Sequence, residues 1–320
     1  MLGCNNKALV EKGEEVAEET ESQEAKTIKF CYQDGITALT AAKLAKENPT
    51  IDEDVIIEYE MQKSPDLLVS KVLKEEADIA IVPSNLAAQA YNKGIPYKIV
   101  GTATWGSMYL VSTEDIQDFE DLKGREIYAF GKGLTPDLVL RYTLAGNGID
   151  PDEDVTITYL NSASEMGPAF LGGKTHLALL SEPLATAVLM KKEEAKIIFD
   201  LNEEWSSITG ADKGYPQASL VVKWELIENN TEFVNKLIDY YVESRKWAEE
   251  NPEKLAEYAE ELEISVPKDV ILEGIKWTNV DSFHIGDSME EYRIYYESIM
   301  DFAPDFIGGN IPDEEIYFER

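Results

Sequence analysis

Two segments far apart in the chain share one pattern: a short apolar run, a polar turn that contains proline, and a helix-forming run. They span residues 77–90 and 174–187. Each predicts a buried strand that turns directly into a helix, because proline near a helix start has no N–H to lose and a φ that is already helical. A chain that repeats this unit is expected to fold into two similar α/β lobes.

The same alternation of strand and helix runs through most of the chain. Short apolar runs rich in β-formers are followed by polar turns and then by runs with helical spacing. Such alternation produces parallel sheets with right-handed crossovers. The expected strands cover residues 28–32, 55–59, 79–82, 125–130, 155–159, 176–180 and 195–200.

Two further β-forming runs interrupt this alternation. Residues 107–113 and 217–222 are interpreted as strands that cross from the first lobe to the second and back. The chain after residue 224 is mostly helical and is expected to pack on the first lobe. The prediction is two βα lobes joined by two crossing strands, with residues 27–110 and 221–320 in lobe 1 and residues 111–220 in lobe 2.

The N-terminal segment, residues 1–26, has a different character. Leu2, Gly3 and Cys4 look like the end of a bacterial lipoprotein signal, whose cysteine becomes lipid-modified after cleavage. Seven glutamates follow from Glu11 to Glu24 among few apolar residues, and this composition cannot bury enough surface to order itself. We interpret the segment as a lipoprotein anchor remnant with Cys4 as the lipid attachment site, followed by a disordered acidic tether. An ordinary disordered tail is the alternative.

Composition narrows the function classes. The chain of 320 residues is 44% hydrophobic, enough for sizeable cores, and carries a net charge of −33. Because affinity for phosphate backbones rests on Lys and Arg, a nucleic-acid partner is not expected. No apolar run reaches the ~18 residues that a membrane-spanning helix needs.

The sequence shows no catalytic constellation. His176 and His284 have no partner at metal-ligand spacing, and no nucleophile-elbow motif is present. The glycine turn at residues 131–133 lacks the third glycine of a dinucleotide-binding loop and is not a phosphate-binding P-loop. No catalytic residue, metal site or cofactor is therefore predicted.

Polar turns between strands and helices are the candidate binding positions. They occur at residues 33–35, 84–85, 133–135 and 181–182 and at Ser64. Ligands of open α/β sheets bind beyond the carboxyl ends of strands, and helix N-termini offer free N–H groups there. For any single turn, an ordinary helix cap is the simpler interpretation. Trp105 is a candidate for stacking on a flat ligand, or equally for packing between lobes.

Several of these motifs resemble the nitrate/sulfonate/taurine-type solute-binding proteins of ABC transporters, a group that includes binders of the thiamine pyrimidine precursor. The resemblance covers roughly residues 27–310, with the motifs in the right order. The Ser-Glu-Pro turn is the most specific element. The motifs that carry it are residues 79–85, 131–137, 147–152 and 180–186.

The resemblance implies a type II periplasmic-binding fold with a ligand cleft between two lobes. It also implies hinge closure, delivery of a small molecule to a membrane permease, an extracytoplasmic location at a lipid anchor, and a monomer. By position, the implied ligand-binding residues are Asp34, Gly35, Ser64, Ser84, Asn85, Gly133, Thr135 and Glu182, with Trp105 carried over less firmly.

The ligand class stays open at this point. Lys132 is the one basic residue at a predicted pocket turn, so a nitrate- or bicarbonate-like anion is not obvious. The turn at residues 33–35 lacks the tryptophan that this turn carries in pyrimidine-precursor binders. Two alternatives remain: an enzyme on the same fold, of the pyrimidine-precursor synthase or menaquinone-pathway type, and a ligand-sensing domain that feeds a receptor.

Overall fold

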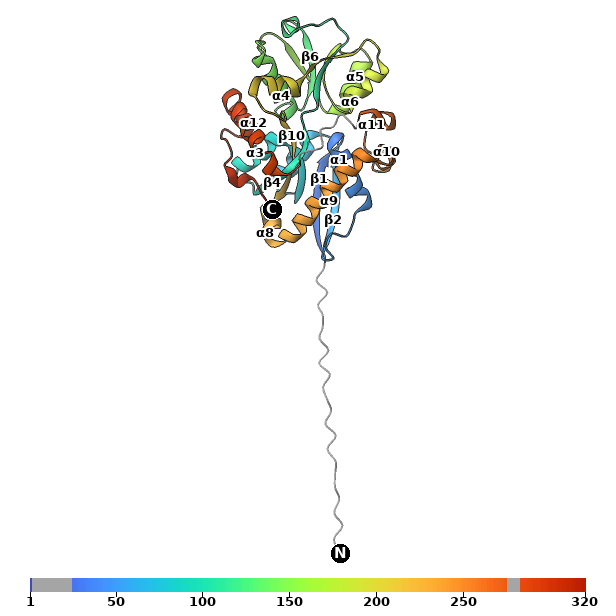
Figure 1. Ribbon diagram of the computed structural model, residues 1–320, viewed down its shortest axis with the longest axis vertical. Helices are drawn as coiled ribbons and strands as arrows, with labels where there is room; N and C mark the ends of the chain where they lie inside the picture. The colour runs from blue at the N-terminus through green and yellow to red at the C-terminus, as the bar shows by residue number, and fades with distance from the viewer. Residues whose placement is uncertain (2–24, 275–282) are drawn as a thin grey trace.

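Two five-stranded sheets form the frame of the protein, one in each of two lobes (Figure 1). The structure is a computed structural model that describes Met1, residues 25–274 and residues 283–320. Cys4 and the acidic segment after it lie outside the described residues. The fold begins at the strand that starts with Lys26.

The first sheet has the strand order β2-β1-β3-β10-β4. β2, β1 and β3 are parallel, and β10 lies antiparallel between β3 and β4. Seven of the eight positions in β10 are buried, as expected for an inner strand with both faces of its sheet covered. The strands of this sheet are β1 (Lys26–Gln33), β2 (Val55–Gln62), β3 (Ile79–Pro83), β4 (Tyr97–Trp105) and β10 (Pro216–Lys223).

The second sheet repeats this arrangement with the order β7-β6-β8-β5-β9. β6 is parallel to β7 and β8, and β5 lies antiparallel between β8 and β9, just as β10 does in the first sheet. The prediction of two similar α/β lobes is confirmed. The strands are β5 (Met108–Ser112), β6 (Glu126–Phe130), β7 (Thr156–Leu160), β8 (Leu177–Ser181) and β9 (Lys196–Asp200).

The two expected crossing strands belong wholly to one sheet each. β5 pairs along its length with β8 and β9, and β10 pairs with β3 and β4. The first passage between lobes is therefore the pair Gly106 and Ser107, and the second is the segment that ends at Tyr215. These passages differ by a few residues from the predicted lobe bounds, because strand pairing on both edges holds each run inside its sheet.

The two passages are tied to each other. The Gly106 N–H donates to the Tyr215 carbonyl at 3.0 Å. A Cβ on Gly106 would lie 2.0 Å from Asn202 Oδ1, so only glycine fits where the passages meet.

Helices cover both sheets, and the C-terminal ones pack mainly on the first lobe. Figure 1 shows α9 lying across the lower lobe beside α1. Its buried positions recur at helical spacing, and one of them, Tyr241, meets Thr40 of α1 at 2.8 Å between hydroxyl oxygens. The helices are α1 (Ile36–Glu47), α2 (Pro65–Leu73), α3 (Ser84–Asn92), α4 (Thr135–Gly146), α5 (Ala163–Leu171), α6 (Leu184–Lys191), α7 (Leu201–Thr209), α8 (Trp224–Asn229), α9 (Thr231–Glu250), α10 (Pro252–Glu261), α11 (Lys268–Gly274) and α12 (Met289–Phe302).

Two of these C-terminal helices also reach the second lobe, which extends the sequence-based expectation. α11 contacts α6, and Figure 1 shows the two side by side. On α12, the Tyr295 hydroxyl lies 2.9 Å from Thr135 Oγ1 at the start of α4. The lobes are thus joined by flanking helices as well as by the two passages.

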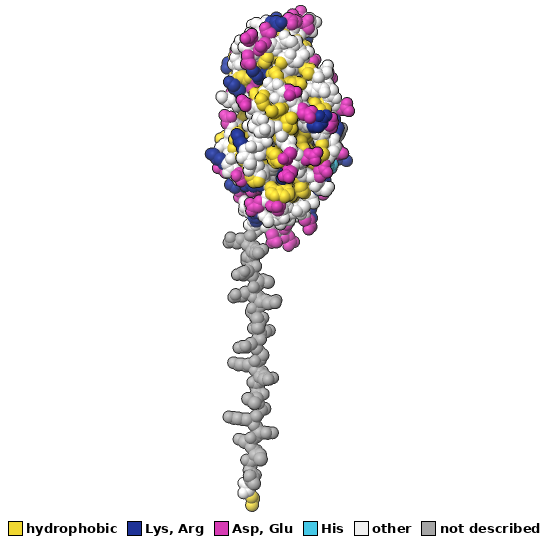
Figure 2. Space-filling view, turned by 90° about the vertical axis from the view of Figure 1, so that its left-hand side faces the viewer, with side chains coloured by type: hydrophobic (Ala, Val, Ile, Leu, Met, Phe, Trp, Pro, Cys, Tyr) yellow, Lys and Arg dark blue, Asp and Glu magenta, His cyan; other side chains and the backbone are white. Residues whose placement is uncertain are grey.

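Acidic side chains are spread over the surface. On the face shown in Figure 2 they are scattered over both lobes among polar and apolar side chains. This distribution fits a solvated acidic surface. Within the described part of the chain, no helix combines the length and apolar character needed to cross a membrane.

Candidate ligand-binding site

A cavity of about 330 Å³ lies between the two lobes. The last residues of four parallel strands line it: Gln33 of β1, Pro83 of β3, Phe130 of β6 and Ser181 of β8. Parallel strands place their carboxyl ends at one edge of a sheet, and the two sheets present these edges to each other. The volume is in the range of small-molecule sites, which is about 300–1,000 Å³.

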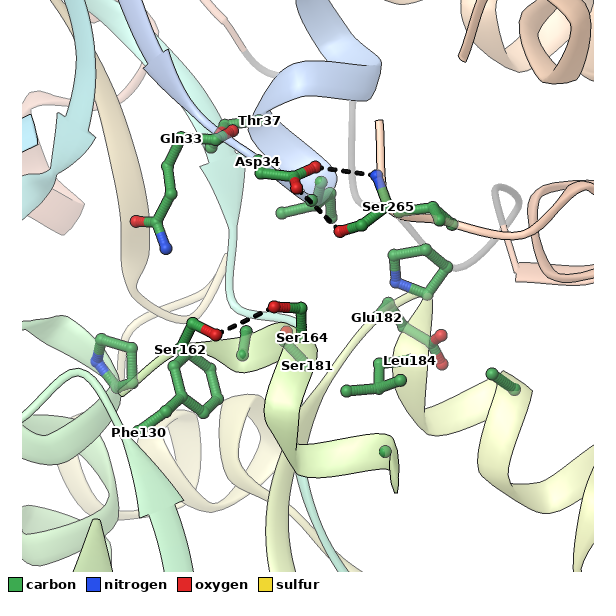
Figure 3. A pocket seen from close by; sticks show the side chains of 18 of the residues that line it. Gln33, Asp34, Thr37, Phe130, Ser162, Ser164, Ser181, Glu182, Leu184 and Ser265 are labelled. Carbon is green, nitrogen blue, oxygen red and sulfur yellow. Dashed lines mark hydrogen bonds between the residues drawn. The ribbon is translucent and has the colours of Figure 1, made fainter. Parts of the chain in front are cut away.

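Three helices begin at the cavity: α1 follows β1, α5 follows β7 and α6 follows β8. α1 starts after Gly35, α5 after Ser162 and α6 after Pro183, and all three of these residues line the cavity. Figure 3 shows Gln33 and Thr37 on one side and Ser162, Ser164 and Ser181 on the other. No side chain caps α1 or α5 among the described residues. Their first N–H groups can therefore serve a bound molecule.

Asp34 joins the β1–α1 turn to the turn between α10 and α11. Its Oδ1 accepts from the Ser265 N–H at 3.0 Å, and its Oδ2 accepts from Ser265 Oγ at 2.8 Å (Figure 3). Lys63 Nζ lies 3.2 Å from Oδ2. The cavity wall formed by residues 265–267 is thus attached to the first lobe through this carboxylate.

Glu182 is the buried acid of the second lobe's wall and is only 1% exposed. Its Oε1 accepts from Thr186 Oγ1 at 3.1 Å and its Oε2 from the Thr186 N–H at 3.4 Å, both in the first turn of α6. Burial raises the pKa of this carboxyl to about 7, although the bonds from Thr186 act in the opposite direction. No described Lys or Arg forms an ion pair with it.

Asn85, Gly133 and Thr135 meet one another rather than the cavity. The Asn85 amide donates to the Gly133 carbonyl at 3.1 Å and to the Phe306 carbonyl at 3.0 Å. Its Oδ1 accepts from Thr135 Oγ1 at 3.2 Å. The predicted turns of the two lobes do face each other here, but they form a direct hydrogen-bonded link between lobes.

Three other predicted residues also lie outside the cavity lining. Ser84 is fully buried with its Oγ 2.8 Å from Ser219 Oγ. Ser64 is the half-buried N-cap residue of α2. Trp105 is 1% exposed at the end of β4, and Lys213 Nζ lies 5.9 Å from its ring centre. Of the predicted set, the cavity collects Asp34, Gly35 and Glu182.

Sequence reasoning missed several lining residues. Ser162 and Ser164 follow a strand and open a helix, so the rule that identified the other turns could have included them. Phe130 and Ser265 gave no such signal, since an aromatic strand residue and a serine between helices are both common. Gln217, at the start of β10, is a lining residue that only the pairing of the two passages explains.

Comparison with known proteins assigns the chain to a family. Residues 51–255 match the family described as NMT1/THI5 like. The chain belongs to the NMT1/THI5-like family. One curated relative is YtlA of Bacillus subtilis strain 168, named for a suspected role as a binding protein. It is 25% identical over 195 residues, which are 59% of this chain and 56% of YtlA, so the match spans little more than half of that relative.

Solved structures similar to this NMT1/THI5-like chain include an ABC transporter and two periplasmic binding proteins. One from Parabacteroides distasonis, titled an ABC transporter, has 26% identity and a TM-score of 0.73, covering 92% of this chain and 99% of its own. The aliphatic sulphonate binding protein SsuA of Escherichia coli has 17% identity and a TM-score of 0.70, with 92% of each chain covered. The nitrate-binding protein NrtA of Synechocystis has 15% identity and a TM-score of 0.66, covering 89% and 84%. The expected periplasmic-binding fold is confirmed.

Proposed function

We propose that this chain is the extracytoplasmic solute-binding component of an ABC importer. It captures a small organic or anionic ligand between its two lobes and delivers it to a membrane permease. The observation that carries the proposal is the interlobe cavity, which strand ends and helix starts of both lobes line together. A ligand held by both lobes favours the closed arrangement, and that is the state a permease can recognise.

The relatives support this reading over the enzyme alternative. SsuA and NrtA are binding proteins by name, and the Parabacteroides protein is an ABC transporter by title. The cavity itself offers no set of side chains arranged for proton transfer among the described residues. Glu182 is engaged by its own helix, and Asp34 is engaged by Ser265 and Lys63.

The proposal includes an anchor and an oligomeric state. A binding protein that works outside the cell without an outer membrane needs attachment, which a lipid on Cys4 and the acidic segment after it would provide. Both lobes of one chain line the cavity, and we propose that the protein works as a monomer.

Native mass spectrometry of the purified chain tests the proposal. We expect the mass of one chain plus one small molecule that is released unchanged after denaturation. Ala163→Trp should empty the site, because Ala163 lines the cavity and an indole would fill it. Thr156→Trp is the matched control, since Thr156 is exposed at the far end of β7. Conversion of the bound molecule into a product of different mass would refute the binding-protein function.

A further inference from the structure

Gln217 is held in one orientation beside the first passage between lobes. Its side chain is 8% exposed, and its Oε1 accepts from the Ser107 N–H at 3.0 Å. Because a backbone N–H can only donate, the carbonyl half of the Gln217 amide must face Ser107. The Nε2 group therefore faces away from Ser107. It has no hydrogen-bond partner among the described residues, and Gln217 lines the cavity.

Other donors around the cavity are open as well. The N-termini of α1 and α5 come from opposite lobes, and no described side chain caps either of them. The Ser181 hydroxyl belongs to a residue that is 9% exposed and also has no hydrogen-bond partner among the described residues. Donors that line a cavity and have no partner in the described part of the protein are available to a bound molecule.

The two carboxylates of the cavity are, by contrast, already occupied. Asp34 accepts from Ser265 and pairs with Lys63, and Glu182 accepts twice from Thr186. A ligand that matches the open N–H donors brings oxygen or nitrogen acceptors, and the Gln33 amide, unpaired among the described residues, can donate or accept. The rest of the lining, including Phe130, is largely apolar.

We propose that Gln217 is a ligand-binding residue whose amide N–H group, together with the N-termini of α1 and α5, holds an acceptor group of the ligand. The acceptor is an oxygen of a carboxamide, carboxylate or sulfonate on an apolar body. This inference rests on the proposed function and deepens it. Because Ser107 fixes the same amide, the ligand contact is joined directly to the passage between lobes.

Calorimetry with two matched pairs of probes tests the assignment: nicotinamide with nicotinate, and butanesulfonamide with butanesulfonate. Each pair shares its carbon skeleton and differs in charge. Gln217→Glu keeps an oxygen that accepts from Ser107 but replaces the N–H donor by a second oxygen. At about pH 8, where an ordinary glutamate is ionised, we expect a probe that binds the unmodified protein to bind the variant at least about tenfold more weakly.

The pH profile separates ligand contact from a structural role. When the carboxyl introduced by Gln217→Glu is protonated, it carries an O–H that can donate again. The affinity of this variant, divided by that of the unmodified protein, should therefore recover towards about pH 4. Gln62→Glu is the matched control. Gln62 is similarly buried at the end of β2, lies outside the cavity lining, and should show no loss of affinity.

The outcomes are distinct. Binding of a probe that Gln217→Glu leaves unchanged, or a loss that does not recover at low pH, overturns the assignment and leaves the proposed function intact. If none of the four probes binds, the proposal that Gln217 and the N-termini of α1 and α5 hold an acceptor group is wrong. Chemical conversion of a probe refutes the proposed function itself. Which member of a pair binds then decides between a charged and an uncharged acceptor.

Discussion

Glu182 combines two conditions that are costly together: it is almost fully buried, and no described cation pairs with it. Its two bonds from Thr186 satisfy both carboxylate oxygens in the first turn of α6. They compensate only part of the loss of water, and the pKa of the carboxyl therefore remains raised. Once ionised at high pH, the buried Glu182 carboxyl therefore destabilises the folded state.

Replacing this acid should change how stability depends on pH. Between the ordinary glutamate pKa and about 7, the folded protein holds a proton on Glu182 that the unfolded chain releases, so stability falls as pH rises through this window. We expect the unmodified protein to lose about 2–3 kcal/mol of stability relative to Glu182→Gln between about pH 4 and pH 8.

Urea unfolding across this pH range measures the effect. Glu193→Gln is the control, because Glu193 is exposed in the same lobe. A difference between Glu182→Gln and the unmodified protein that does not vary with pH would contradict the assignment of a raised pKa.

At the scale of single residues, the sequence predicts which positions lie at strand ends but not what they contact. Asp34 and Asn85 both stand at the start of a helix after a parallel strand. Asp34 reaches the cavity wall, whereas Asn85 meets a turn of the other lobe. The difference depends on the angle between lobes, which no local pattern encodes. The sequence places Glu182 at the turn before a helix, but only its burial in the folded protein explains its raised pKa.

At the scale of elements, the start of α3 and the start of α4 form a link between lobes. Asn85 makes three hydrogen bonds there, of which those to Gly133 and Thr135 cross from one lobe to the other. The sequence predicts that both turns precede a helix. It does not predict that the two turns contact each other, because that contact depends on how the two lobes are oriented.

Removing the Asn85 side chain should loosen this link. Asn85→Ala leaves the Gly133 carbonyl without this partner, whereas the Phe306 carbonyl keeps Gln89 and the Thr135 hydroxyl keeps Tyr295. We expect the free energy of unfolding to fall by about 1–3 kcal/mol. The distribution of interlobe distances in small-angle X-ray scattering should also broaden. Gln89→Ala is a matched control, because Gln89 also donates to the Phe306 carbonyl but is not bonded to the second lobe. Equal broadening in both variants would argue against an interlobe role for Asn85.

At the scale of the whole molecule, alternation of strands and helices is sufficient to predict two α/β lobes, and the repeated segment identifies the equivalent strands β3 and β8. The passages between lobes were predicted less well. A run of apolar β-formers has the same sequence pattern whether it crosses between sheets or lies inside one. Only the pairing of β5 and β10 with a strand on each side shows that both lie inside a sheet.

The N-terminal segment gives a prediction on the same scale. Expressed behind a lipoprotein leader in a Gram-positive bacterium, the chain should incorporate labelled palmitate and sediment with membranes, because Cys4 would carry the lipid. Cys4→Ser should abolish labelling and release the chain, whereas Cys31 is fully buried and should remain unlabelled. Equal membrane association of Cys4→Ser would contradict the anchor.

The antiparallel strand between β3 and β4 has a consequence for how the chain folds as it is synthesised. β3 and β4 leave the ribosome early, but the strand that separates them, Pro216–Lys223, follows only after every strand of the second sheet. The second lobe, contiguous in sequence, can therefore complete its sheet first. The first lobe must keep a gap between two apolar strands until its last strand arrives. Such unpaired edges invite association with other chains, so the period between these two events is when a nascent chain most needs protection.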